Sequence, residues 1–362
     1  MFRRFFCRTI VAVILLSGLT CQCFCIKTSA ESVVLMEQRS GRVLYERNAD
    51  EEKLIASITK IMTAVVAIEH GNLDDAYTVR AEDMTEGSSM YLRVGEVLTL
   101  EELLYGLLLA SGNDAALAVA HCVSGDVDDF VELMNRTADR LGMKHSGFAN
   151  PNGLDAEGHY SSARDMATLS AYALENETFR RIASTMSANI GGRYLQNHNK
   201  LLRLCEGCIG LKTGYTKAAG RTLVSAAQRE GMTLICVTLK DGDDWNDHLA
   251  LFDYGFDAFR LEMIAGRGQK LACMTVRGGG QGSVFLAAGA DLCYPVAGDE
   301  RLTLKIVAPV SISAPVAAGQ IVGKVYACLD GEEVARVDLV AMEAVSEKTD
   351  KKAEGFRRQL LQ

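Results

Sequence analysis

Three short groups of polar residues carry the side chains that nucleophilic catalysis needs: Ser57-Ile58-Thr59-Lys60, Ser111-Gly112-Asn113 and Lys212-Thr213-Gly214. On a helix, residues i and i+3 lie on one face with β-carbons about 5–6 Å apart, so Lys60 can reach the hydroxyl of Ser57. A serine hydroxyl is a poor nucleophile until a base takes its proton, and an ammonium group cannot do so. The spacing therefore predicts acyl transfer to Ser57, with a neutral Lys60 as the base.

This chemistry requires a lowered pKa for Lys60. Burial against the apolar neighbour Ile61 and the charge of a second cation, Lys212, would both lower that pKa from its reference value of about 10.4. Ser57 stands near the N-terminus of the predicted helix, where unpaired backbone N–H groups stabilise a developing oxyanion. Gly214 allows a strand edge to approach a ligand without an intervening side chain.

Composition and absent motifs narrow the class of protein. The chain has 362 residues, of which 48% are hydrophobic and 23% charged, so it is globular. Its formal net charge of −8 argues against a nucleic-acid partner, because phosphate binding needs an excess of basic residues. The sequence has no H-E-x-x-H motif, no G-x-S-x-G elbow and no phosphate-binding G-x-x-x-x-G-K-[ST] loop. The serine–lysine set is therefore the candidate for catalysis.

The segments around the three motifs predict a mixed α and β domain. Residues 32–46 predict a β-hairpin, and from Thr222 the period again becomes that of strands. Between them, five segments have apolar residues at helical spacing: 57–71, 99–110, 114–123, 130–141 and 163–174. Strands at both ends of a helical middle predict an α+β catalytic domain over residues 31–260, in which an antiparallel sheet has flanking helices.

The composition changes after about residue 260. Short segments rich in β-branched residues are separated by turns that contain Gly or Pro, and they cover 270–276, 284–287, 302–307, 321–329 and 333–341. This pattern predicts a small all-β domain over residues 261–341. Residues 342–362 are a mostly charged tail, with only Phe356, Leu360 and Leu361 as an apolar face.

The N-terminus predicts export. Residues 1–8 contain three arginines and no acid, and the apolar run 9–19 follows, which is the pattern of a signal peptide over residues 1–30. A retained membrane helix is the alternative, but the apolar run is shorter than the roughly 20 residues needed to span a bilayer. A lipid attached to Cys21 fits less well. We expect an extracytoplasmic protein at the cell wall or on the outer face of the cytoplasmic membrane.

Seven of the eleven cysteines remain after residue 30, and two of them form the pair Cys205-x-x-Cys208. A zinc site would need a second ligand pair, and a redox site would need a compact thioredoxin-like unit around it. A local disulfide or two small buried thiols fits this pair better.

The three motifs resemble those of serine β-lactamases and penicillin-binding proteins. Further runs extend the match to the low-molecular-mass penicillin-binding proteins of the serine D-alanyl-D-alanine carboxypeptidase family: ASITKIMTA at 56–64, NPNGL at 150–154, HYSSA at 159–163, NKLL at 199–202 and GLKTGYT at 210–216. The resemblance covers almost the whole chain after residue 30. It implies a β-lactamase/transpeptidase-like fold followed by the small β domain.

The resemblance implies a role for each catalytic motif residue. Ser57 would be the acylated nucleophile and Lys60 its base. Ser111 would relay protons toward the leaving group, and Asn113 would hold a substrate amide. Lys212 would support the electrostatic field of the site.

It also implies the substrate-binding residues. Lys212 and Thr213 would orient the terminal carboxylate, while Gly214 lies in the strand beside the substrate. The backbone N–H groups of Ser57 and Tyr215 would form the oxyanion hole. Some family members hold the carboxylate with a further arginine after this motif. Residues 237–248 contain none, so that contact is not transferred.

The substrate that the resemblance implies is the D-Ala-D-Ala end of a peptidoglycan stem peptide, and β-lactams should acylate the same serine. No metal or organic cofactor is called for, and we expect a monomer. Relatives often end in an amphipathic membrane helix, so the short charged tail leaves peripheral membrane contact as an expectation.

Two alternatives stay open. A serine β-lactamase would deacylate quickly, and Glu132-Leu133-Met134-Asn135 is similar to a deacylation motif of class A enzymes. The apolar face of its helix, however, places Glu132 toward solvent. The other alternative is a catalytically silent relative that binds the cell wall through the same groove.

Overall fold

The computed structural model describes residues 26–348. The predicted signal peptide and charged tail fall mostly outside these residues, so both stay predictions. Across residues 26–348, no helix combines the length and the apolar character needed to span a bilayer.

An antiparallel five-stranded sheet lies at the centre of the N-terminal part, in the order β2-β1-β9-β8-β7. Its strands are β1 Ser32–Glu37, β2 Val43–Arg47, β7 Cys208–Thr216, β8 Gly220–Arg229 and β9 Met232–Leu239. β1 and β9 are buried along their whole length, because both faces of the sheet are covered. β7 lies at one edge of the sheet, so the Lys212-Thr213-Gly214 motif stands in a strand with one unpaired side.

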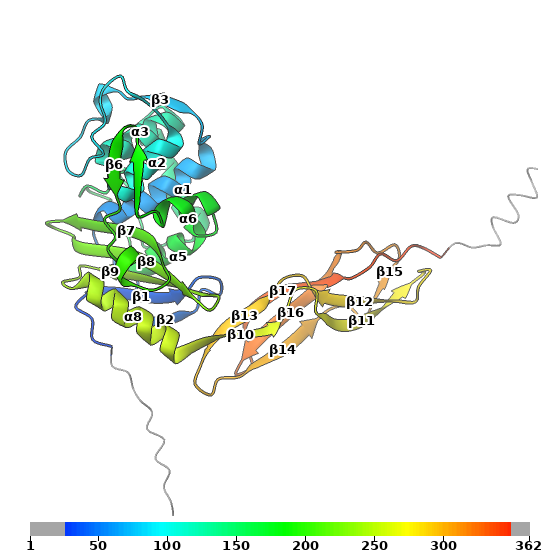
Figure 1. Cartoon of the computed structure of the whole chain (residues 1–362). Helices are drawn as coiled ribbons and strands as arrows, with labels where there is room; N and C mark the ends of the chain where they lie inside the picture. The colour runs from blue at the N-terminus through cyan, green and yellow to red at the C-terminus, as the bar shows by residue number, and fades with distance from the viewer. Residues whose placement is uncertain (1–25, 349–362) are drawn as a thin grey trace, which may run out of the picture.

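Helices cover both faces of this sheet (Figure 1). One layer contains α1 Lys60–His70, α2 Leu100–Leu109, α3 Asn113–Ser124, α4 Val127–Leu141, α5 Ala163–Ala173 and α6 Glu177–Ala183. The opposite face carries α8, Asp244–Ala258. Each layer has its own apolar core against the sheet. The α+β fold with an antiparallel sheet and flanking helices is confirmed.

Shorter elements complete this part of the chain. They are the 3-10 turn η2 Ala81–Asp83, the pair β3 Ala76–Thr78 and β4 Val97–Thr99, the pair β5 Ser187–Ile190 and β6 Arg193–Gln196, and α7 Leu201–Leu204. A capping box starts α2: the Glu102 backbone N–H donates to the Thr99 hydroxyl at 3.2 Å, and the Thr99 N–H donates to the Glu102 carboxylate at 2.9 Å.

The helix expected over 57–71 begins differently from an α-helix. Ala56–Thr59 form a 3-10 turn, η1, which continues into α1 at Lys60. Residues i and i+3 eclipse one another in a 3-10 turn, so Ser57 and Lys60 are stacked more directly than in an ideal α-helix.

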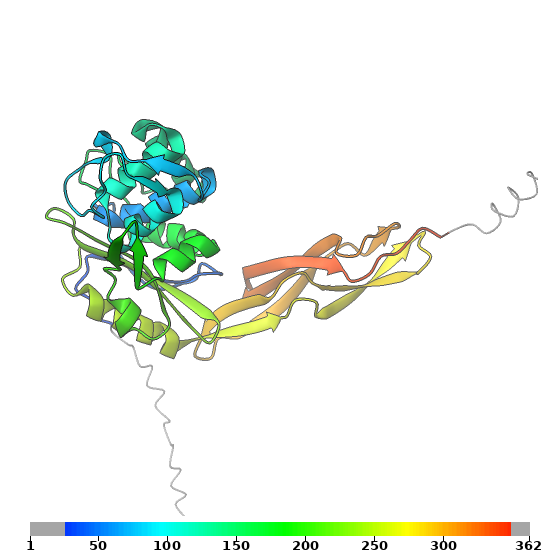
Figure 2. The ribbon, with the colours of Figure 1, turned by 45° about the horizontal axis from the view of Figure 1, so that its top comes forward.

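Between residues 259 and 348 the regular elements are all strands, and this C-terminal part extends away from the first (Figures 1 and 2). β10 Phe259–Ala265 pairs with β13 Leu292–Ala297. A six-stranded sheet in the order β14-β16-β17-β12-β11-β15 follows, with β11 Lys270–Arg277, β12 Ser283–Ala288, β14 Leu302–Val307, β15 Ser311–Ser313, β16 Ile321–Leu329 and β17 Glu332–Ala341. It encloses a third apolar core, as expected for a small β domain.

Arg42 connects the two parts. Its guanidinium donates to both oxygens of Glu300, at 2.7 and 2.8 Å, and to the Pro295 carbonyl at 2.6 Å. The same group lies 5.3 Å from the ring centroids of Phe259 and Tyr294. A planar cation that is paired and stacked in this way fixes orientation more firmly than a single surface ion pair does.

Candidate active site

Lys60 lies at the centre of the candidate site. It is fully buried, and its Nζ lies 2.9 Å from Ser57 Oγ, 2.7 Å from Asn113 Oδ1 and 2.6 Å from the Asn152 carbonyl oxygen. A neutral amine has two N–H donors and one lone pair. Because the amide and carbonyl oxygens can only accept, the two N–H groups serve them, and the lone pair is left for the Ser57 hydroxyl. The geometry therefore fits a neutral Lys60 that accepts a proton from Ser57.

The electrostatics of the site favour this neutral form. Burial, and secondarily the charge of Lys212, lower the pKa of Lys60 well below its usual value, while Asp114 acts in the opposite direction. Lys212 is also buried, and burial lowers its pKa to about 7. Two amines share one desolvated region, so holding both as cations is unfavourable.

The Ser111 and Asn113 motif stands where α2 ends and α3 begins. Asn113 Nδ2 donates to the Glu86 carbonyl at 2.8 Å, which fixes the amide with Oδ1 toward Lys60. Ser111 is buried and has a φ of 59°, a conformation uncommon outside glycine. Asp114 accepts from the Met90 backbone N–H at 3.0 Å and thereby ties the preceding loop to this motif.

The third motif approaches Ser57 along the edge strand β7. Lys212 Nζ donates to the Thr213 carbonyl at 2.9 Å. A Cβ on Gly214 would lie 2.9 Å from the Ser57 backbone N and 3.1 Å from the Ile55 carbonyl oxygen. Only glycine allows this close approach, as the sequence predicts for Gly214.

A cavity of about 340 Å³ opens above these groups. Its lining includes residues of all three motifs and of β7, β8 and α8, namely Ser57, Ser111, Thr213, Gly214, Tyr215, Arg221, Asp244 and Trp245. All the predicted site residues thus line this cavity or, in the case of Lys60, Asn113 and Lys212, lie at the buried base of the site. A nucleophile, a neutral base and an unpaired strand edge in one cavity can carry out acyl transfer.

Thr59 and His159, which the sequence places only within longer motifs and gives no role, help to position the site. The Thr59 hydroxyl donates to the Ala56 carbonyl at 2.8 Å and lies 2.8 Å from His159 Nε2. His159 Nδ1 accepts from the Ala149 backbone N–H at 3.1 Å, so the proton resides on Nε2. Burial lowers the pKa of His159 to about 4, which keeps this imidazole neutral.

Asn152 and Gly153 hold the loop below η1. Asn152 supplies a carbonyl to Lys60, a contact that depends on the backbone and so has no signal in the side-chain pattern. Gly153 has a φ of +87°, and a Cβ there would lie 2.2 Å from the Ala56 carbonyl oxygen. The run at 150–154, which supported the resemblance, is the signal that could have placed this loop at the site.

Other candidate groups lie outside this cavity. Glu132 is 65% exposed and pairs with Arg136, while the Asn135 amide binds the backbone of Phe148, so the interpretation that Glu132 faces solvent is confirmed. Cys205 and Cys208 are free thiols, so a local disulfide is not formed. Within residues 26–348, no three His, Cys, Asp or Glu side chains gather as metal ligands would.

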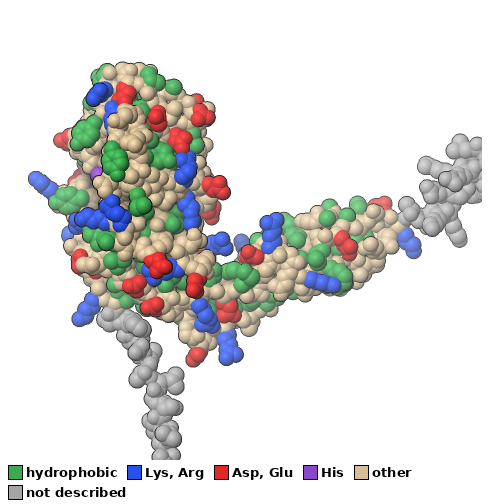
Figure 3. Space-filling view, viewed as in Figure 1, with side chains coloured by type: hydrophobic (Ala, Val, Ile, Leu, Met, Phe, Trp, Pro, Cys, Tyr) green, Lys and Arg blue, Asp and Glu red, His purple; other side chains and the backbone are tan. Residues whose placement is uncertain are grey.

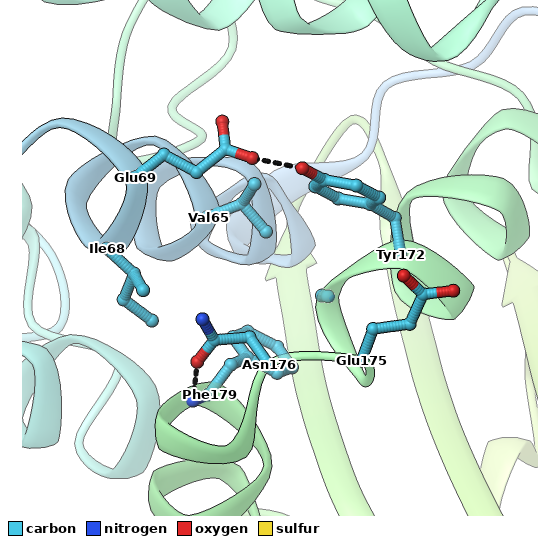
Figure 4. Close-up of a pocket in the computed structure, with 8 residues that line it drawn as sticks. Val65, Ile68, Glu69, Tyr172, Glu175, Asn176 and Phe179 are labelled. Carbon is cyan, nitrogen blue, oxygen red and sulfur yellow. Dashed lines mark hydrogen bonds between the residues drawn. The ribbon is translucent and has the colours of Figure 1, made fainter. Parts of the chain in front are cut away.

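A second cavity, of about 210 Å³, lies between α1, α5 and α6 (Figure 4). Val65, Ile68 and Phe179 form its apolar walls, and Glu69 accepts a hydrogen bond from the Tyr172 hydroxyl at its rim. It contains neither a nucleophile nor a lowered-pKa base, so it offers no comparable chemistry.

Comparisons with known proteins agree along both parts of the chain. Residues 21–243 match the D-alanyl-D-alanine carboxypeptidase family, and residues 259–347 match the C-terminal domain of penicillin-binding protein 5. The D-alanyl-D-alanine carboxypeptidase DacF of Bacillus subtilis is 33% identical, covering 90% of this chain and 87% of the relative. DacC of Escherichia coli is 32% identical, covering 88% and 84%.

Solved structures show the same likeness. Penicillin-binding protein 5 from Haemophilus influenzae superposes with a TM-score of 0.75 at 30% identity, covering 89% of this chain and 98% of that one. PBP3 from Streptococcus pneumoniae has a TM-score of 0.79 at 24% identity, covering 88% and 100%, and supports the fold. The two-part architecture is therefore shared.

Proposed function

We propose that this chain, which belongs to the D-alanyl-D-alanine carboxypeptidase family, removes the terminal D-alanine from peptidoglycan stem peptides through an acyl-enzyme on Ser57. The family makes the chain a serine-type carboxypeptidase, a hydrolase among the penicillin-binding proteins. The observation that carries the assignment to Ser57 is the position of the Lys60 amine, which is buried and 2.9 Å from the Ser57 hydroxyl.

In the acylation step, Ser57 Oγ attacks the carbonyl carbon of the penultimate D-alanine while its proton passes to Lys60 Nζ. The C–N bond to the last residue then breaks, and the leaving nitrogen takes a proton through Ser111, which lines the cavity beside Ser57. Asn113 orients Lys60 through Oδ1, and a contact between Asn113 and a substrate amide would be made in addition to this hydrogen bond. Neutral Lys60 makes this transfer favourable at neutral pH.

The oxyanion forms where β7 and η1 meet. We assign its donors to the backbone N–H groups of Ser57 and Tyr215, which Gly214 allows to converge. Hydrolysis of the ester by water then releases the shortened peptide and restores the hydroxyl of Ser57. Lys212 and Thr213 lie along the same strand, where a terminal carboxylate would bind.

The cellular setting is part of the same proposal. The predicted signal peptide 1–30 and the proposed substrate both favour a position outside the cytoplasm, at the cell wall or on the outer face of the cytoplasmic membrane. β-Lactams should acylate Ser57 as substrate analogues. We propose that the enzyme acts as a monomer without a metal or organic cofactor, and that the tail 342–362 provides any peripheral contact with the membrane.

The test measures the intact mass of the protein after incubation with benzylpenicillin, and D-alanine release from a peptide ending in D-Ala-D-Ala. We expect one penicilloyl adduct and release of D-alanine, with both abolished in Ser57→Ala and both reduced at least a hundredfold in Lys60→Ala. Glu132→Gln, which changes an exposed carboxyl group, should retain both. Unchanged release in Ser57→Ala would disprove the proposal, fast loss of the adduct would indicate a β-lactamase, and absence of labelling would indicate a silent binder.

A further inference from the structure

One cationic side chain of the cavity has no part in the steps above. Tyr215 of β7 is directly opposite Arg221 of β8 in the antiparallel register. Opposed residues point to the same face of a sheet, and residues two apart on one strand share that face. The side chains of Thr213, Tyr215 and Arg221 therefore share the face of the sheet that α8 covers, and all three line the cavity that contains Ser57.

Arg221 is held in place from one side. Its Nη2 donates to both carboxylate oxygens of Asp244, at 2.7 and 2.9 Å, and Asp244 is only 4% exposed at the start of α8. The guanidinium carbon also lies 5.6 Å from the ring centroid of Trp245. Pairing and stacking together fix the plane of the group before any ligand arrives, which lowers the entropy lost on binding.

The free part of this guanidinium faces the cavity. Among residues 26–348, no hydrogen bond engages Nε or Nη1 of Arg221, and the side chain is 44% exposed. The hydroxyl of Thr213, on the same face, likewise donates no hydrogen bond within the described chain. Two side chains of the cavity wall, Arg221 and Thr213, therefore carry donors without acceptors in the described chain.

The charge of this wall suits an anion. Lys200 also lines the cavity, and its Nζ lies 5.9 Å from the Trp245 ring, while Asp244 supplies the one acid of the lining. Figure 3 shows Lys and Arg side chains gathered near the level of β7 on the face in view. Each carboxylate oxygen can accept from a separate donor, so a free carboxylate matches this pair better than a neutral amide.

We propose that Arg221, held by Asp244 and Trp245, binds the C-terminal carboxylate of the substrate together with the Thr213 hydroxyl, and so makes the enzyme selective for peptides with a free carboxylate. The proposal rests on the proposed function, because it names the group of the same substrate that this wall recognises. Asp244 is then a positioning residue, which acts through Arg221 rather than on the substrate.

The chain offers a matched control for testing Arg221. Arg229 also lies on β8 and also pairs with an acid of α8, Asp253, at 3.4 Å, but it does not line the cavity. Arg221→Gln removes the cation, and Arg221→Lys keeps the charge without the planar group. Arg229→Gln removes a longer and more exposed arginine–aspartate pair between the same two elements, outside the cavity. Thermal unfolding of all three variants checks that the fold is retained.

Two assays separate this inference from the proposed function. The first compares kcat/KM for acetyl-Lys-D-Ala-D-Ala with that for the same peptide carrying a C-terminal amide. The second compares the rate of Ser57 acylation by benzylpenicillin with the rate for its methyl ester. We expect Arg221→Gln to lower the carboxylate preference in both assays about ten- to a hundredfold, mainly through KM for the peptide, with a smaller loss in Arg221→Lys and none in Arg229→Gln.

Different results would overturn the role of Arg221 and the proposed function. A carboxylate preference in Arg221→Gln within twofold of the unmodified enzyme, in a variant that remains folded, overturns the role of Arg221. An unmodified enzyme that is acylated by benzylpenicillin but releases no D-alanine overturns the proposed function. In that case, the comparison of benzylpenicillin with its methyl ester still decides whether Arg221 binds a carboxylate. An equal loss in Arg229→Gln also overturns the proposal, because the effect would then follow from general charge or stability.

Discussion

Replacing Lys212 by methionine should stabilise this protein at acidic and neutral pH while it impairs activity. Burial lowers the pKa of Lys212 from an ordinary 10.5 to about 7. Between these two values the unfolded chain holds a proton that the folded chain has released. Below pH 7 the folded state therefore carries the full free-energy cost of the buried charge, and this cost disappears as the pH rises toward 10.5.

The size of the effect follows from the two pKa values. With 10.5 in the unfolded chain and about 7 in the folded chain, the penalty is about 5 kcal/mol at pH 6 and falls to about 1 kcal/mol at pH 10. Methionine also loses the hydrogen bond from Lys212 Nζ to the Thr213 carbonyl, which costs about 1–3 kcal/mol at every pH. We therefore expect Lys212→Met to be more stable by about 2–4 kcal/mol at pH 6, and to lose about 4 kcal/mol of that advantage by pH 10.

Urea unfolding at pH 6, 7, 8, 9 and 10 measures this difference. The single tryptophan, Trp245, lies in the N-terminal part and reports its unfolding by fluorescence. Lys200→Met is the control, because Lys200 is an exposed lysine of the same cavity, and its difference from the unmodified chain should not depend on pH. A Lys212→Met difference that stays constant from pH 6 to pH 10 would refute the reasoning, because the buried amine would then carry its charge in the folded state.

Two further changes test how the loops hold the nucleophile and base. Gly153→Ala introduces a Cβ 2.2 Å from the Ala56 carbonyl oxygen, so we expect acylation by benzylpenicillin to slow at least tenfold. The control is Gly158→Ala, at a position with a φ of +75° and open space around it, which should not change the acylation rate. Equal rates in the two variants would contradict this expectation. Asn113→Asp places a carboxylate beside Lys60 Nζ and should raise the pKa of Lys60. The pH at which the acylation rate increases should then be higher than in the unmodified enzyme. An unshifted pH profile would show that Lys60 is not the base.

Much of the fold could be predicted because local patterns and tertiary packing agree. The apolar period gave the positions of α1 to α5, and the capping box at Thr99 marks the start of α2. The strands on either side of residue 230 were also predicted. The start of α1 was not, because the 3-10 turn depends on Ala56, whose positive φ of 50° is imposed by the loops around it rather than by its own preference. The helix α8 was missed because its aspartates and Gly255 are poor helix formers that interrupt the apolar pattern of Asp244–Ala258.

The candidate site was predictable where side chains define it and not where the backbone does. Ser57 and Lys60 lie within one turn, so their contact follows from spacing alone. The acceptor that completes the environment of Lys60 is the carbonyl of Asn152, 92 residues away, and any residue at that position would present the same group. The Arg221–Asp244 pair could not be predicted from the sequence either, because an arginine on a strand and an aspartate at the start of a helix become partners only through the packing of α8 on β8.

The protonation states of the two buried lysines, Lys60 and Lys212, depend on each other. Each is held in a low-dielectric region, and the charge of Lys212 lowers the pKa of Lys60. A substrate carboxylate that enters beside Thr213 and Arg221 would stabilise Lys212 as a cation, since an adjacent anion favours the charged form. A charged Lys212 in turn disfavours a second cation at Lys60. In the proposed reaction, binding of the substrate thus keeps the base neutral at the moment when Ser57 must give up its proton, and the two amines can act in opposite protonation states.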